Sequence, residues 1–196
     1  MAKRHIEVTP EMEQPLAEEI VEETLEVNNV KLCLRDVNGY HFPNDTTINI
    51  EDFNNTQKLE QAIIEEYSKE PGDIQLQEIF LYDHSGLAIQ TFPQSRWDSS
   101  FLGFAFTTRE DGETDEEMDK RLQRNIKMFG DSVAGEIYSI HLVEEKTCKC
   151  CGHTTVESVS GFDFVFGSQV NTAQQIIDMF KQDGIEVEKG IKIRYV

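Results

Sequence analysis

The 196-residue sequence has no long apolar run and few basic residues. No segment approaches the roughly 20 apolar residues that a membrane-spanning helix needs, so a membrane protein is not expected. Two basic residues near the start are not followed by an apolar stretch, which argues against a secretory signal. Only 18 Lys and Arg stand against 37 Asp and Glu. Direct binding to nucleic acid is therefore not expected, because it depends on cations that displace the counterions of phosphates.

Cysteine and glycine patterns exclude further classes. Four cysteines do not make a disulfide framework when three of them are Cys148, Cys150 and Cys151. Reduced thiols or a metal site suit that crowding better, and both favour a cytoplasmic location. The glycines follow neither phosphate-loop nor dinucleotide-binding spacing, and no Gly-x-Ser-x-Gly motif is present. These motifs therefore identify no reaction.

Apolar periodicity predicts an α+β fold with a largely antiparallel β-sheet and three to four helices. Strands are expected at residues 30–37, 46–50, 79–82, 87–91, 101–107 and 191–195, with a long hairpin of residues 133–144 and 154–166. Helices are expected at residues 16–27 and 56–68, from residue 114 to Gly130, and from residues 171–174 to Gly184.

Two parts of the chain are expected to differ in organisation. Residues 1–29 form an acidic N-terminal segment that is flexible up to about residue 15 and then forms a short helix. That helix would bury Leu16, Ile20 and Val27, with Val21 nearby. Residues 30–196 are expected to form a single α+β domain, because no linker or repeat interrupts them.

Negative charge is concentrated in two short segments of this chain of net charge −19. Residues 1–29 hold eight Glu against Lys3 and Arg4, a net of −6, and residues 110–119 hold seven acids and no base, a net of −7. A charge run is usually a solvated face, but this density also suits a basic protein surface as partner. The partner-binding residues predicted on this basis are Glu18, Glu19, Glu22, Glu23, Glu26, Asp111, Glu113, Asp115, Glu116, Glu117 and Asp119.

A candidate metal site lies in the turn of the long hairpin. Cys148 and Cys151 have the C-x-x-C spacing of half a zinc ribbon, and His153 would be a third ligand. A structural zinc needs four ligands, and no second half-motif is present. The alternative is a turn rich in thiols without metal, so the expected cofactor is none or a structural zinc.

A second candidate site would be catalytic. His84 is followed by Ser85, and Asp98 by Ser99, which on paper provides a base, an orienting acid and a nucleophile. Turn formation by Asp83, Ser85 and Gly86 explains the first segment equally well.

Several short motifs recur in the order found in a known family. They are the string FLYDHSG at residues 80–86, the Phe92-Pro93 pair, Trp97-Asp98-Ser99, Gly103, Gly135-Glu136-Ile137-Tyr138, Cys151-Gly152 and residues 161–167. Residues 78–167 thereby resemble a family of small uncharacterised proteins of bacteriophages and plasmids. Arg96 and Ser100 depart from the Pro and Gly usual in that family. The resemblance implies an accessory gene of a mobile element and assigns no catalytic role.

The leading hypothesis is a non-enzymatic phage or plasmid protein in the cytoplasm of a bacterial host. It would bind a host nuclease of the restriction or CRISPR type, or its guide complex, through the acidic residues, as a nucleic-acid mimic. The first alternative is a small metal-dependent or Ser/His hydrolase centred on His84 and Asp98, with His141. The second is an interaction scaffold whose charge serves solubility alone.

Overall fold

The computed structural model describes residues 3–11, 14–37, 39–42, 48, 50, 56–84 and 86–196, with the backbone alone for residues 14–20. Within these residues, four helices and two mostly antiparallel sheets of four strands confirm the predicted α+β class. The chain forms two compact units. The terminal unit comprises Met1–Glu18 and Gly135–Val196, and the central unit comprises Glu19–Ala134. These boundaries differ from the division at residue 29 that the sequence suggested.

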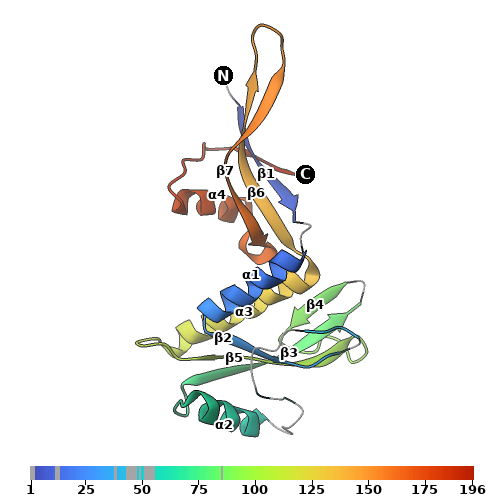
Figure 1. Ribbon diagram of the computed structural model, residues 1–196, viewed down its shortest axis with the longest axis vertical. Coiled ribbons are helices and arrows are strands. Elements are labelled where there is room, and N and C mark those ends of the chain that lie inside the picture. The colour runs from blue at the N-terminus through green and yellow to red at the C-terminus, as the bar shows by residue number, and fades with distance from the viewer. Residues whose placement is uncertain are drawn as a thin grey trace. The chain divides into compact units, whose positions relative to one another are not determined.

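The terminal unit is a four-stranded sheet with one α-helix against it (Figure 1). Its strands are β1 (Lys3–Pro10), β6 (Ile137–Thr147), β7 (Thr154–Phe166) and β8 (Lys192–Tyr195), in the order β7-β6-β1-β8. A short 3₁₀ turn, η2 (Gly167–Gln169), leads to α4 (Ala173–Gln182). The core forms between α4 and the sheet, where the rings of Phe162 and Phe180 lie 5.0 Å apart.

Strand β1 corrects the expectation that residues 1–15 are flexible. It pairs antiparallel with β6 and parallel with β8, so it lies inside the sheet. Ile6 and Val8 are fully buried in the core cluster. The signal was the short alternation of apolar and polar residues from His5 to Thr9, which the abundant polar residues around it obscured.

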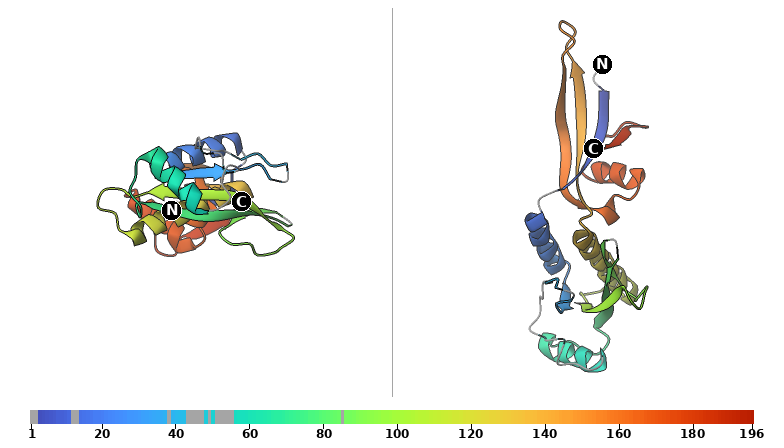
Figure 2. Two further views of the ribbon diagram at one scale, coloured as in Figure 1. Left: turned by 90° about the horizontal axis from the view of Figure 1, so that it is seen from below. Right: turned by 90° about the vertical axis from the view of Figure 1, so that its right-hand side faces the viewer.

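The central unit is built on a second sheet with helices on both faces. Its strands are β2 (Val30–Leu34), β3 (Ile74–Asp83), β4 (Leu87–Gln90) and β5 (Ser99–Thr108), in the order β2-β5-β3-β4. Helix α2 (Thr56–Tyr67) covers one face, and α3 (Asp115–Ala134) lies on the other with residues 19–27 of α1 (Gln14–Val27) (Figure 2). Leu59 and Ile63 of α2 pack on Phe104 and Phe106 of β5. The expected run at residues 46–50 lies largely outside the described residues.

The buried side of α1 differs from the predicted one. Val21 and Leu25 are buried, whereas Val27 is 83% exposed. The side chains of Leu16 and Ile20 lie outside the described residues. Val21 and Leu25 are four positions apart and share a helix face, so the true apolar stripe is rotated from the expected one.

Helix α3 begins as predicted and ends later. Glu117 accepts hydrogen bonds from the backbone N–H and hydroxyl of Thr114, and Thr114 accepts one from the Glu117 N–H, which confirms the capping box. The predicted end at Gly130 is wrong. Gly130 instead packs against Ile89 of β4, and the left-handed residue that follows the helix is Gly135.

Gly103 of β5 lies close to the backbone of β2. A Cβ atom there would lie 2.2 Å from the carbonyl oxygen of Cys33, so the position requires glycine. No helix in the described part of the chain is long and apolar enough to cross a membrane.

Candidate functional site

The acidic region of the central unit is organised around Arg121. This side chain is only 9% exposed and makes two hydrogen bonds to the Glu113 carboxylate, at 2.9 and 2.7 Å. Its remaining N–H groups donate to the carbonyl oxygens of Asn28 and Thr108, at 2.5 and 2.9 Å, and to the Thr107 hydroxyl at 2.5 Å. A buried guanidinium with this many acceptors fixes three separate chain segments together.

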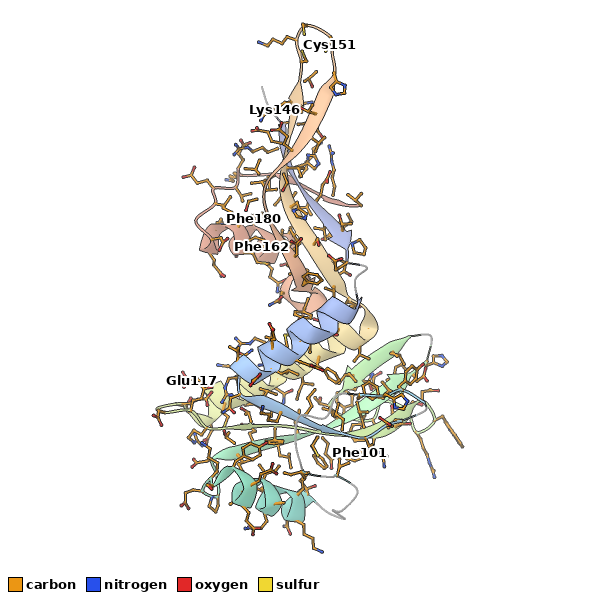
Figure 3. The ribbon with its side chains drawn as sticks, in the orientation of Figure 1. Phe101, Glu117, Lys146, Cys151, Phe162 and Phe180 are labelled. Atoms are coloured by element: carbon orange, nitrogen blue, oxygen red, sulfur yellow. The ribbon has the colours of Figure 1, made fainter. Side chains whose placement is uncertain are left out.

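Arg121 thereby joins the two acidic segments that are far apart in the sequence. Asn28 follows α1 directly, and its side-chain amide also donates to Asn125 of α3 at 3.0 Å. The C-terminal end of α1 and the first turns of α3 therefore lie side by side. Figure 3 labels Glu117 at this end of α3. The sequence contained no signal for this contact, because Arg121 and Asn28 are 93 positions apart.

Glu113 is a structural residue rather than an available surface carboxylate. Its side chain is 11% exposed, and the hydrogen bonds from Arg121 hold the pKa of the carboxyl below its ordinary value. It also accepts a hydrogen bond from the Glu110 backbone N–H at 3.1 Å.

Glu116 and Glu117 serve the start of α3. Glu117 belongs to the capping box, and its hydrogen bonds with Thr114, led by the one from the backbone N–H, lower the pKa of the carboxyl. Glu116 pairs with Lys120 one turn later at 2.6 Å. Glu116 and Glu117 are both exposed and lie in the first turn of α3, where negative charge interacts favourably with the helix dipole.

Asp115 and Asp119 also have partners within the unit. Asp115 pairs with Arg109, whose Nε also contacts Asp73 at 3.1 Å. Asp119 accepts a hydrogen bond from the side chain of Gln75 at 2.9 Å. Five of the six predicted residues in this segment therefore have partners within the unit.

The other described carboxylates predicted to bind a partner are exposed and have no ion-pair partner among the described residues. They are Glu22, Glu23, Glu26 and Asp111. The side chains of Glu18 and Glu19 lie outside the described residues.

The negative charge on α1 is unfavourable for the helix itself. The last turn contains no basic residue, although the C-terminal end of a helix favours cations. Glu26 lies in that turn and Glu23 just before it. These two residues therefore contribute charge at a cost in helix stability.

The tip of the β6–β7 hairpin brings three thiols together. The Sγ atoms of Cys148, Cys150 and Cys151 all lie within 4.8 Å of one another, and all three residues are exposed. Cys148 and Cys150 are free thiols with their sulfur atoms 2.8 Å apart. Figure 3 labels Cys151 at this tip. His153 is not part of the group, so the predicted set Cys148, Cys151 and His153 is not the set that the fold gathers.

The hydrogen bond between Cys148 and Cys150 shifts the pKa values of these two thiols in opposite directions. The Cys150 thiol and then the backbone N–H groups of Cys150 and Cys151 lower the pKa of Cys148 to about 6. The same contact with Cys148 raises the pKa of Cys150. Cys148 is therefore largely a thiolate at neutral pH. The remaining cysteine, Cys33, is buried in β2 and hydrogen-bonds the Ile48 carbonyl at 3.3 Å.

Only some of the candidate catalytic residues lie close together. The turns that carry His84 and Asp98 meet, with 3.7 Å between His84 Nδ1 and Asp98 Oδ1. Ser95 donates to the other Asp98 oxygen at 2.9 Å. No serine hydroxyl in the described part of the chain bonds the His84 ring, which is 67% exposed. Ser85 lies outside the described residues, and the Ser99 hydroxyl accepts from the Ser95 N–H.

His141 belongs to the terminal unit, in β6. Its ring lies across from Gly161 of β7, with Ser158 Oγ 3.4 Å from Nδ1 and Asp163 Oδ1 3.4 Å from Nε2. A Cβ at Gly161 would lie 2.2 Å from this ring, so the glycine makes room for it. These contacts with β7 account for His141 as a residue of the paired strands β6 and β7.

Two large aromatic side chains are exposed. Phe92 and Trp97 lie between β4 and β5, and Trp97 is 90% exposed. Trp97 lies in a local turn, in which the Ser95 hydroxyl accepts from the Trp97 N–H and donates to Asp98. Sequence hydrophobicity alone gave no signal that these rings point to solvent.

Comparison of the chain with protein-family models, curated proteins and solved structures gave no match.

Proposed function

We propose that this protein is a non-enzymatic accessory protein of a phage or plasmid that acts in the cytoplasm of a bacterial host. It binds a basic surface of a host nuclease of the restriction or CRISPR type, or of its guide complex, and inhibits it as a nucleic-acid mimic. The mobile-element part of the proposal rests on the resemblance of residues 78–167 to phage and plasmid proteins.

The observation that carries the proposal is the set of exposed carboxylates without ion-pair partners among the described residues. Glu22, Glu23 and Glu26 lie on α1, and Asp111 lies in the loop before α3. A basic groove that normally holds phosphates would be attracted to such a surface at long range. Glu23 and Glu26 are unfavourable for the helix that carries them, which supports a role outside the fold.

The fold assigns different roles to the two acidic segments. Glu113 and Glu117 hold the start of α3, so replacing them would disturb the unit as well as its charge. The α1 residues make no such contacts among the described residues. The proposal therefore assigns the direct contacts to Glu22, Glu23, Glu26 and Asp111, and a supporting negative field to Asp115, Glu116 and Asp119.

The test uses immobilised full-length protein and lysate of bacteria that express restriction and CRISPR nucleases. Bound proteins are identified by mass spectrometry at low and high salt. We expect one nuclease to be recovered at low salt and released at high salt, because salt screens contacts between exposed charges. Glu22→Gln/Glu23→Gln/Glu26→Gln should lose this recovery.

The matched control is Asp183→Asn/Glu186→Gln/Glu188→Gln. It removes the same number of charges from exposed residues between α4 and β8 in the terminal unit. The control should recover the nuclease like the unmodified chain. Recovery of no nuclease, or equal loss with both triple variants, would overturn the proposal.

A further inference from the structure

We propose that the tip of the β6–β7 hairpin binds one thiophilic d¹⁰ metal ion, zinc or copper(I), through the Sγ atoms of Cys148, Cys150 and Cys151. This site belongs to the terminal unit and is independent of the acidic surface on which the proposed function depends.

The spacing of the sulfur atoms fits a shared ion. Two sulfurs bound to one zinc at about 2.3 Å lie roughly 3.8 Å apart in tetrahedral geometry. The three Sγ atoms already lie within 4.8 Å of one another, and those of Cys148 and Cys150 are 2.8 Å apart. Small side-chain rotations would therefore bring all three to bonding distance of one ion.

The backbone of the turn holds the thiols in place. The Cys148 N–H donates to the His153 carbonyl at 2.7 Å, and the Gly152 N–H donates back to the Cys148 carbonyl at 2.9 Å. Gly152 has a φ of 73°, a left-handed conformation that glycine adopts without strain. Strands β6 and β7 are paired up to Thr147 and Thr154, directly beside the turn. The three ligands therefore sit on a loop of defined shape.

The chemistry of the ligands selects a soft ion. Thiolates prefer zinc and copper(I), whereas calcium and magnesium prefer oxygen ligands. A metal binds thiols in their deprotonated form, so binding of the ion releases thiol protons. The hydrogen that Cys150 shares with Cys148 would be released when the ion binds.

The ligand set differs from the one that the sequence pattern indicates. Cys148 and Cys151 form the C-x-x-C spacing, but the fold adds Cys150 and omits His153. Three thiolates complete a trigonal copper(I) site. With zinc they leave a fourth position for water or for a group of another molecule, because the site is exposed.

The test uses the full-length reduced protein without oxygen. One equivalent of Zn²⁺ or Cu⁺ is added separately, unbound ion is removed, and the retained metal is measured together with its sulfur neighbours by X-ray absorption. We expect one ion per chain with three sulfur ligands. The zinc-loaded chain should show a fourth oxygen or nitrogen neighbour, and the copper(I)-loaded chain should show none.

The variants separate this ligand set from the alternatives. Cys150→Ser should weaken binding at least tenfold, whereas His153→Ala should bind as the unmodified chain does. Both positions are exposed in a turn, so circular dichroism should show an unchanged fold. The proposal is overturned if the unmodified chain retains no ion, if Cys150→Ser retains as much, or if His153→Ala loses it.

Discussion

At the residue scale, Arg121 is the side chain on which the acidic region depends. Arg121→Met removes the cation and leaves Glu113, 11% exposed, without its bidentate partner. Breaking a buried ion pair on one side typically costs about 3 kcal/mol or more. We expect a loss of that order in the free energy of unfolding, measured by urea denaturation. The control Arg124→Met changes an exposed residue of the same helix and should cost less than about 0.5 kcal/mol.

The same pair gives the variant a distinct dependence on pH. Because Arg121 lowers the pKa of Glu113, the pair contributes its full stability above the ordinary carboxyl value of 4.5. That contribution is lost as the pH falls through the lowered pKa. The difference between the unmodified chain and Arg121→Met should therefore shrink at acidic pH. A difference that stays constant from neutral to acidic pH would contradict the assigned partner.

Cys148 should be a reactive thiol. Its alkylation by iodoacetamide, followed by peptide mass spectrometry, should rise with pH around a midpoint of about 6, because the thiolate is the nucleophile. Cys150→Ala removes the largest cause of the shift, so the midpoint should move up toward the ordinary value of 9.0. A midpoint near 9 in the unmodified chain, or one unaffected by Cys150→Ala, would contradict the hydrogen-bonded pair.

At the scale of elements, the negative charge of the α1 glutamates is expected to lower the stability of that helix. Glu22→Gln/Glu23→Gln/Glu26→Gln removes negative charge near the C-terminal end of the helix, where it opposes the dipole. We expect the triple variant to be more stable by about 1 kcal/mol, with a higher melting temperature in calorimetry. This gain should accompany the loss of partner binding.

The control triple in the segment between α4 and β8 should raise the melting temperature less than the α1 triple, since only Asp183 stands at the C-terminal end of a helix. A triple α1 variant that melts at a lower temperature than the unmodified chain would mean that these carboxylates stabilise the helix. The stability argument for an external role would then fail.

Elements with strong local signals could be predicted from the sequence. The capping box at Thr114 and the periodicity of α2 and α3 fix those helices through contacts between near neighbours. Strand β1 and the stripe of α1 were misjudged, because Ile6 and Val8 are buried only by pairing with β6 and β8, distant in sequence. The helix continues past Gly130, which packs against Ile89 in a tertiary contact that no local pattern indicates.

In the candidate sites, too, local patterns could be predicted from the sequence and tertiary contacts could not. C-x-x-C spacing pointed to Cys148 and Cys151, but only the turn geometry adds Cys150 and leaves out His153. Charge clusters could be read directly from the sequence. Which carboxylates are committed to the fold could not, because Arg121 is brought to Glu113 and Asn28 by the packing of α3.

At the scale of the whole molecule, the net charge of −19 supports the proposed function together with the exposed carboxylates of α1 and Asp111. Charge of one sign accelerates encounter with an oppositely charged surface and makes binding sensitive to salt. Solubility alone would require only that the charge be far from zero, and its distribution would not matter. A nucleic-acid mimic must in addition compete with nucleic acid for one groove.

The most direct test of the central claim is therefore a competition on the recovered nuclease. Its cleavage of a DNA substrate is measured with increasing amounts of this protein, at several concentrations of the substrate DNA. We predict inhibition that a higher concentration of substrate DNA relieves, and none by Glu22→Gln/Glu23→Gln/Glu26→Gln. Inhibition that DNA does not relieve, or that the triple variant retains in full, would contradict nucleic-acid mimicry by the acidic surface.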